Sequence, residues 1–172
     1  MTRVSYAKKI ALVGIMAATL ECGKLALAAI PNVEVVTLLL AIYGYSFGWL
    51  GIAASFVFVA IEPLIYGFGT WVITYLIYWP TVALIFMLLG RAKIKNRFIM
   101  TAVAVTLTFL FGVLSSLVDV GLFTGYFDNF IYRFIIYYAR GIIFYAVQIA
   151  CNAVLFLTLF PFFRRRLEGL KI

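Results

Sequence analysis

Four long stretches without a charged residue constrain the fold of this 172-residue chain more than any other feature. A helix rises about 1.5 Å per residue, so about 20 apolar residues cross the ~30 Å hydrocarbon core of a bilayer. Only 12% of the residues are charged, against about a quarter in soluble domains. We therefore expect an all-α integral membrane protein. The stretches are Val35–Ile61, Pro63–Gly90, Phe98–Val118 and Gly141–Phe163, of 27, 28, 21 and 23 residues.

Residues that often carry out catalysis or bind metals are missing or scarce. The chain has no histidine and only two cysteines, Cys22 and Cys151, which lie far apart in the sequence. A usual zinc site therefore has no ligand set, and a nucleophile cannot be paired with a histidine. The chain also contains no P-loop, so any ATP hydrolysis has to come from a partner. We expect a non-catalytic protein with no metal or cofactor of its own.

The basic residues gather in three clusters, and these predict the topology. Cytoplasmic loops of membrane proteins are enriched in lysine and arginine, so all three clusters should be cytoplasmic. An even number of helices then separates each pair of clusters. The same bias explains the net charge of +8 without a nucleic-acid partner. The clusters are Arg3, Lys8 and Lys9; Arg91, Lys93, Lys95 and Arg97; and Arg164, Arg165, Arg166 and Lys171.

Helix-breaking residues divide the apolar stretches further. Breakers at Pro31-Asn32, at Gly44 to Gly48 and at Gly67 to Gly69 leave four helices before the second basic cluster. We expect two more after it. The prediction is one domain over residues 1–172, with six transmembrane helices and cytoplasmic termini. The expected helices span residues 8–29, 33–47, 49–66, 70–90, 98–121 and 135–163, and the outward connections are Ile30–Asn32, Tyr66–Gly69 and Leu122–Arg133.

Four charged residues fall away from the cytoplasmic ends of the predicted helices. A charge near the bilayer centre costs about 2.5 to 3.5 kcal/mol, so such residues face a cavity, a partner charge or the lipid headgroups. Each one alone also fits ordinary interfacial placement, and Glu34 suits the first turn of a helix. Taken together they favour an outward-facing polar pocket. The four are Glu34, Glu62, Asp119 and Arg140. Glu21 and Lys24, three residues apart on one helix face, are placed to pair with each other.

Aromatic residues are dense near the same end. Trp71, Tyr75 and Trp79 recur at helical spacing, which places them on one face of the fourth predicted helix. Such a stripe forms either an interfacial belt, the stronger interpretation for Trp71, or the wall of a pocket. Pro80 is expected to kink this helix. The residues expected to line a ligand pocket are Asn32, Glu34, Glu62, Tyr66, Trp71, Tyr75, Trp79, Asp119, Asn129, Arg140 and Asn152.

The first predicted helix carries small residues at three-to-four-residue spacing: Ala7, Ala11, Gly14 and Ala18. A strip of this kind lets another helix approach closely. Two interpretations remain open at this point. The strip either packs inside the bundle or docks another protein.

These features together resemble the substrate-binding S-component of energy-coupling factor (ECF) vitamin transporters. The resemblance covers the whole chain in its layout of six helices, basic ends, a small-residue strip and an outer pocket. Two segments are similar to those of S-components associated with cobalamin uptake in Gram-positive bacteria. They are Ile30-Pro31-Asn32-Val33-Glu34 and Glu62-Pro63-Leu64-Ile65-Tyr66-Gly67-Phe68-Gly69-Thr70-Trp71.

The resemblance implies a function and a set of partners. The chain would capture a vitamin, most like cobalamin or a cobinamide-like corrinoid, outside a bacterial cell membrane. It would deliver the vitamin inward with a membrane-embedded T-component and two cytosolic ATPases. The strip would dock on the T-component through Ala7-Lys8-Lys9-Ile10-Ala11 or through Gly14-Ile15-Met16-Ala17-Ala18.

The pocket residues alone leave other ligands and other functions open. Thiamin, its pyrimidine precursor or another small vitamin fits the same groups, and the carboxylates suit a cationic ligand as well. A stand-alone secondary transporter would need an ion-coupling carboxylate deep in the bundle. A membrane-embedded enzyme would need a positioned acid, base or metal, and no spacing in this sequence provides one.

Overall fold

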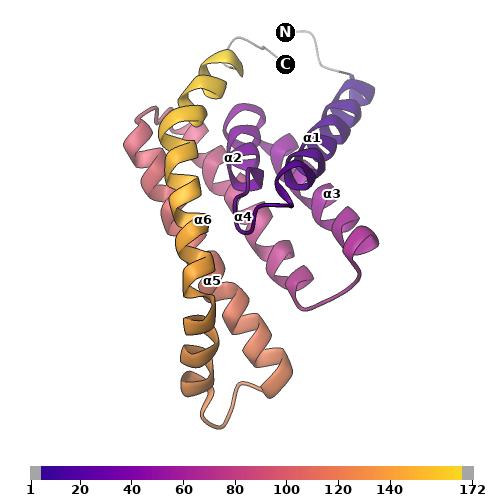
Figure 1. Cartoon of the computed structure of the whole chain (residues 1–172). Helices are drawn as coiled ribbons and strands as arrows, with labels where there is room; N and C mark the ends of the chain where they lie inside the picture. The colour runs from indigo at the N-terminus through magenta and orange to yellow at the C-terminus, as the bar shows by residue number, and fades with distance from the viewer. Residues whose placement is uncertain (1–4, 168–172) are drawn as a thin grey trace.

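The computed structural model describes residues 5–167, which form six α-helices and no β-strand (Figure 1). Arg3 and Lys171, which belong to the terminal basic clusters, lie outside the described residues. The all-helical prediction is confirmed. The helices are α1 (Tyr6–Leu27), α2 (Val36–Phe47), α3 (Trp49–Tyr66), α4 (Trp71–Arg91), α5 (Arg97–Thr124) and α6 (Phe130–Leu167).

The first four helices begin and end within about three residues of the predicted bounds. The long outward connection expected over Leu122–Arg133 is wrong, because the described connection is only residues 125–129. Gly125 ends α5 with a φ of 78°, a conformation that glycine adopts easily. Arg133, already inside α6, donates hydrogen bonds to the carbonyl oxygens of Thr124, Gly125 and Phe127. These bonds close a tight turn and let both helices extend.

Five of the described helices are long and apolar enough to cross a bilayer, which indicates a multi-pass membrane protein. Only α2 is shorter. Its 12 residues rise about 18 Å, little more than half of a ~30 Å core. It lies at the centre of the bundle, in contact with α1, α3, α4 and α6. Its close approach to α4 requires a glycine, because a Cβ at Gly44 would overlap the carbonyl oxygen of Ala83.

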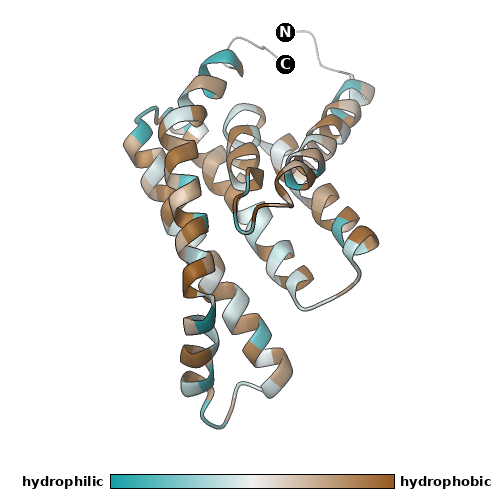
Figure 2. Ribbon diagram, viewed as in Figure 1, coloured by the Kyte–Doolittle hydropathy of each residue, from teal (hydrophilic) through white to brown (hydrophobic). Residues whose placement is uncertain are grey.

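The core and the outer surface are both apolar. Phe58, Phe86 and Phe156 are fully buried between the helices. Large apolar side chains such as Ile143 and Leu64 are 72% and 78% exposed, and Figure 2 shows hydrophobic residues along the outer faces of the helices. A surface of this kind suits a lipid environment.

Most of the helix ends and connections lie at one end of the bundle or the other, and the α1–α2 connection lies between the two ends. The start of α1, the end of α6 and the α4–α5 connection lie at one end in Figure 1, and the α3–α4 and α5–α6 connections lie toward the other. The described members of the three basic clusters are therefore at one end. The α1–α2 connection, residues 28–35, lies part-way along the bundle. We call this segment the strap.

The bundle has two parts. Helices α1, α3 and α4 pack around α2, while α5 and α6 pack mainly against each other as a hairpin. Contacts between α2 and α6 and between α4 and α5 join the two parts. In Figure 1 the hairpin extends beyond the α3–α4 connection.

Candidate functional site

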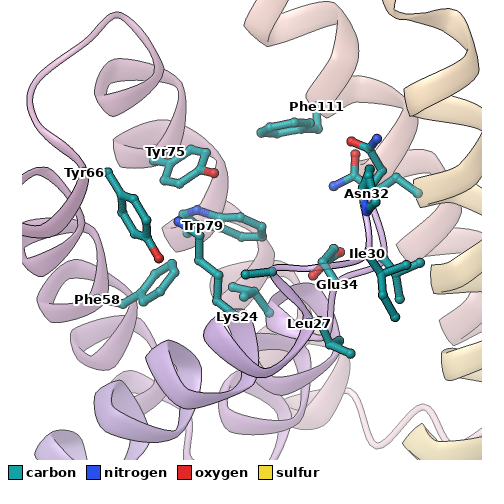
Figure 3. A pocket seen from close by; sticks show the side chains of 15 residues that line it. Lys24, Leu27, Ile30, Asn32, Glu34, Phe58, Tyr66, Tyr75, Trp79 and Phe111 are labelled. Carbon is teal, nitrogen blue, oxygen red and sulfur yellow. The ribbon is translucent and has the colours of Figure 1, made fainter.

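A pocket of about 340 Å³ opens beside the strap, where the two parts of the bundle meet. We call it the strap pocket. Its lining comes from the end of α1, the strap and α2 to α6, so every helix contributes to it. Figure 3 shows aromatic rings on one side and the strap on the other. The lining residues are Lys24, Leu27, Ala28, Ile30, Pro31, Asn32, Val33, Glu34, Val36, Phe58, Tyr66, Tyr75, Trp79, Phe111 and Gln148.

The strap itself is unusual for a segment part-way along a membrane bundle. It is not helical, and Asn32 has a φ of 61°, in the left-handed region where asparagine is more frequent than most residues. Inside a bilayer, irregular backbone is tolerated only where it is buried in protein or lines a water-filled cavity. The short α2 and the preceding strap therefore fit a cavity that opens within the bundle.

The aromatic wall is built by one face of α4. Trp71 and Tyr75 lie with ring centroids 5.1 Å apart, and Tyr75 and Trp79 lie 5.4 Å apart. Phe111 of α5 stacks on Trp79 at 6.2 Å with an interplanar angle of 27°. Phe58 of α3 meets Trp79 edge-on. The wall offers a broad aromatic surface against which a flat ring packs well.

Glu34 closes the opposite side of the pocket, but its carboxylate is largely occupied. Thr37 donates to it twice, from its backbone nitrogen at 2.9 Å and from its hydroxyl at 2.6 Å. The side chain of Asn152, fully buried on α6, donates to the same carboxylate at 2.8 Å and to Thr108 of α5 at 3.0 Å. Glu34 therefore caps the start of α2 and also ties the strap to the hairpin.

Lys24 is the basic residue in the pocket lining. Its ammonium forms an ion pair with Glu62, which is fully buried on α3. The Lys24 side chain remains 27% exposed, and its Nζ lies 4.2 Å from the ring centroid of Tyr66 and 5.6 Å from that of Tyr75. Three groups from α3 and α4 thus hold one ammonium at the edge of the pocket.

The expected pairing of Glu21 with Lys24 is wrong, because Lys24 makes its ion pair with Glu62. Glu62 reaches Lys24 from α3, which packs along α1. Glu21 is buried, and its carboxyl oxygens make no hydrogen bond within residues 5–167. Helical spacing allows Lys24 to pair with Glu21, but the packing of α3 on α1 brings Glu62 to Lys24 instead.

The structure brings some of the predicted pocket residues together and separates others. Asn32, Glu34, Tyr66, Tyr75 and Trp79 line the strap pocket. Glu62 and Asn152 lie behind the lining and hold Lys24 and Glu34 in place. Trp71 extends the aromatic wall through its contact with Tyr75. Asn129 is exposed in the α5–α6 connection, and Asp119 and Arg140 line a different hollow.

This second hollow, of about 350 Å³, lies on the hairpin, and we call it the hairpin hollow. Asp119 accepts hydrogen bonds there from Thr70 and from the Tyr137 hydroxyl, the latter at 2.8 Å. Arg140 is exposed on α6. The four outer charges predicted to share one pocket are therefore divided between two places. The lining residues are Asp119, Val120, Phe123, Thr124, Arg133, Ile136, Tyr137 and Arg140.

Sequence reasoning missed Lys24, Phe58, Phe111 and Gln148 as lining residues. Lys24 had a signal, since it is a lone lysine in an apolar helix. The other three look like ordinary core residues in the sequence. Only the packing of α3, α5 and α6 around the strap brings them to the pocket.

The small-residue strip on α1 faces outward. Ala7, Ala11, Gly14 and Ala18 are all exposed. A Cβ added at Gly14 would meet no atom within 4 Å among the described residues. Within the part of the chain that the structure describes, the strip therefore does not serve internal packing.

Comparison of the chain with models of known protein families, with curated proteins and with solved structures finds no match.

Proposed function

We propose that the chain is the membrane-embedded substrate-binding subunit, or S-component, of an ECF-type importer of a vitamin. The observation that carries the proposal is the strap pocket, a cavity with an aromatic wall and a polar edge inside a small apolar bundle. Pockets with mostly apolar walls and a few fixed polar groups are the usual binding sites for small molecules. The chain binds and releases its ligand, and partner ATPases supply the energy.

The charge distribution supports an orientation for the proposed subunit. The described members of the three basic clusters lie at one end of the bundle (Figure 1). By the positive-inside rule this end is cytoplasmic, so both termini are cytoplasmic and the α3–α4 and α5–α6 connections face outward. In this arrangement all six helices belong to the membrane domain, and α2 with the strap completes one crossing.

The volume of the pocket bears on the ligand. About 340 Å³ is the volume that about eleven water molecules occupy in liquid water, at ~30 Å³ each. This space suits a vitamin with one or two rings, such as thiamin or its pyrimidine precursor. A cobalamin-type corrinoid, which the sequence resemblance favours, exceeds it and would require the strap to move outward.

The exposed strip on α1 supports docking on a membrane-embedded T-component. Replacing Ala11 or Gly14 with tryptophan is expected to abolish uptake while ligand binding stays within about twofold, because only close helix approach is blocked. The matched control is Ile143→Trp, at a large exposed residue of α6 outside the strip and the pocket. Equal loss of binding and uptake in the strip variants would contradict docking.

The test of the proposed function is uptake by cells that carry or lack a T-component and its two ATPases. The small molecule is identified first, by mass spectrometry of what the purified chain releases on denaturation. We expect one bound molecule per chain without nucleotide, and uptake only when all partners are present. A purified chain that releases no small molecule would contradict the proposal.

One observation favours a second candidate, a stand-alone secondary transporter. Glu21 and Glu62 are buried in the bundle beside Lys24, and buried carboxylates of this kind carry protons or ions in such transporters. The same uptake experiment separates the two functions. Accumulation by this chain alone in liposomes, driven by an ion gradient, would favour the transporter.

A further inference from the structure

The charged groups around the strap pocket are not equally free to meet a ligand. The carboxylate of Glu34 accepts three hydrogen bonds from Thr37 and Asn152, out of about four that a carboxylate accepts. The carboxylate of Glu62 lies 1% exposed behind Lys24 and is paired with it. Glu34, the carboxylate in the pocket lining, and Glu62 behind it are therefore already engaged by the chain itself. Glu21 has no hydrogen-bond partner among the described residues, but it is buried outside the lining.

Lys24 is in the opposite situation. An ammonium group has three N–H donors, and the ion pair with Glu62 uses one of them. The side chain is 27% exposed and belongs to the pocket lining. The aromatic rings of Tyr66 and Tyr75 stabilise its charge from the side. A ligand acceptor can reach Lys24 without breaking the ion pair.

The geometry points to a ligand class, and this inference rests on the proposed function. We propose that the strap pocket binds a flat ring compound through an acceptor group, such as a carboxylate, a carbonyl or a ring nitrogen, that accepts a hydrogen bond from Lys24. The ring packs on the wall of Tyr75, Trp79 and Phe111. Glu62 is the counter-ion that positions Lys24 and does not touch the ligand. A permanent cation, the thiazolium of thiamin included, binds poorly, because it would have to lie beside this ammonium. Of the two small vitamins that suit the volume, the neutral pyrimidine precursor is therefore the one that fits the charge.

The pocket carries its own fluorescent reporter. The chain has three tryptophans, and replacing Trp49 and Trp71 with phenylalanine leaves Trp79 in the pocket wall. Three probes with the same six-membered ring differ in charge: nicotinate is an anion, nicotinamide is neutral and 1-methylnicotinamide is a fixed cation. Titration of each into the purified chain in a non-ionic detergent measures its Kd.

The parent chain with Trp79 alone should bind nicotinate and nicotinamide at least tenfold more tightly than 1-methylnicotinamide. Glu62→Gln should tighten nicotinate binding by about threefold or more, because the ammonium loses its counter-ion. If the pocket instead binds a cationic ligand, Glu62→Gln should weaken the binding of that ligand.

A double variant tests Lys24 itself. Lys24→Met alone leaves a buried carboxylate unpaired and risks misfolding, so Lys24→Met is combined with Glu62→Met to remove both charges together. This double variant should lose the preference among the probes, and the control Lys9→Met should keep it.

Three results would each overturn the inference. They are tighter binding of the cation, weaker nicotinate binding by Glu62→Gln, and no saturable binding of any probe up to about 10 mM. A double variant that keeps the full preference would remove the role of Lys24. The chain can fail these tests and still release a small molecule on denaturation and depend on partners for uptake. In that case the proposed function stands, and only the proposed class of ligand, a flat ring with an acceptor group, is rejected.

Discussion

The strap pocket and the hairpin hollow have similar volumes and both are lined by acidic and basic residues, yet they are built differently. In the strap pocket, Glu34 is held by groups from α2 and α6, and Lys24 is held by α3 and α4. In the hairpin hollow, Asp119 bonds to Thr70 and to Tyr137, while Arg140 is exposed on α6. The first site fixes both of its charges, whereas the second leaves Arg140 on the surface.

The difference shows what makes a binding site out of charged residues in a membrane bundle. Fixing a charged group in advance reduces the ordering that a ligand has to pay for on binding. The strap pocket has fixed charges and a wall of aromatic rings that exclude water. Arg140 lies about three turns inside α6 and is exposed, so its long side chain is free to extend toward lipid headgroups. We therefore expect substitutions in the two places to act very differently.

The largest effect is expected from Glu34→Ala. This change removes the cap of α2 and leaves the buried side chain of Asn152 without one of its acceptors. Ligand binding should weaken by about 1 to 3 kcal/mol, or roughly 5- to 150-fold, and the melting temperature should fall. Glu34→Gln keeps an acceptor at the start of α2 and should lose less. Titration calorimetry and thermal unfolding in detergent measure both. Unchanged binding in Glu34→Ala would show that the strap does not contribute to the ligand site.

A smaller effect, confined to stability, is expected from Asp119→Asn. The variant keeps the shape but weakens the hydrogen bonds that join α6 and the start of α4 to α5. Stability should fall by about 1 kcal/mol while ligand affinity stays within about twofold. Binding that falls as much as in Glu34→Ala would show that the two sites act as one.

The smallest effect is expected from Arg140→Ala. Its side chain is exposed and lies in the hairpin hollow, apart from the strap pocket. Affinity for the released small molecule should change by less than about twofold. The equilibrium constant of unfolding, measured by thermal unfolding, should also change by less than about twofold. A tenfold loss of affinity would instead return Arg140 to the ligand site.

Much of the fold is predictable because the signals are local. Charge-free stretches and breakers such as Pro31 and Gly67 fixed α1 to α4 within about three residues. The start of α6 was not predictable, because it depends on bonds from Arg133 back to carbonyl oxygens at the end of α5. A segment that adjoins loop-forming residues becomes helix when such capping is available.

The site is predictable only in part, for a related reason. Helical spacing places Tyr75 and Trp79 on one face of α4, and the sequence places Glu34 at the start of α2. The sequence therefore predicts how far along its helix each side chain lies. It does not predict which neighbouring helix the side chain meets, because that follows from how the helices pack. The choice of Glu62 as the partner of Lys24 and the separation of Arg140 from Glu34 both depend on that packing.

Filling the strap pocket tests the central claim most directly. Ala28 is exposed and lines the pocket, so Ala28→Trp places an indole in the ligand volume with little strain on the core. Ala139→Trp, on the exposed face of α6, is the matched control. Native mass spectrometry of the purified chain counts the bound small molecule. We predict a one-to-one adduct in the parent chain and in Ala139→Trp, and none in Ala28→Trp. An adduct that persists in a folded Ala28→Trp would contradict the strap pocket as the binding site.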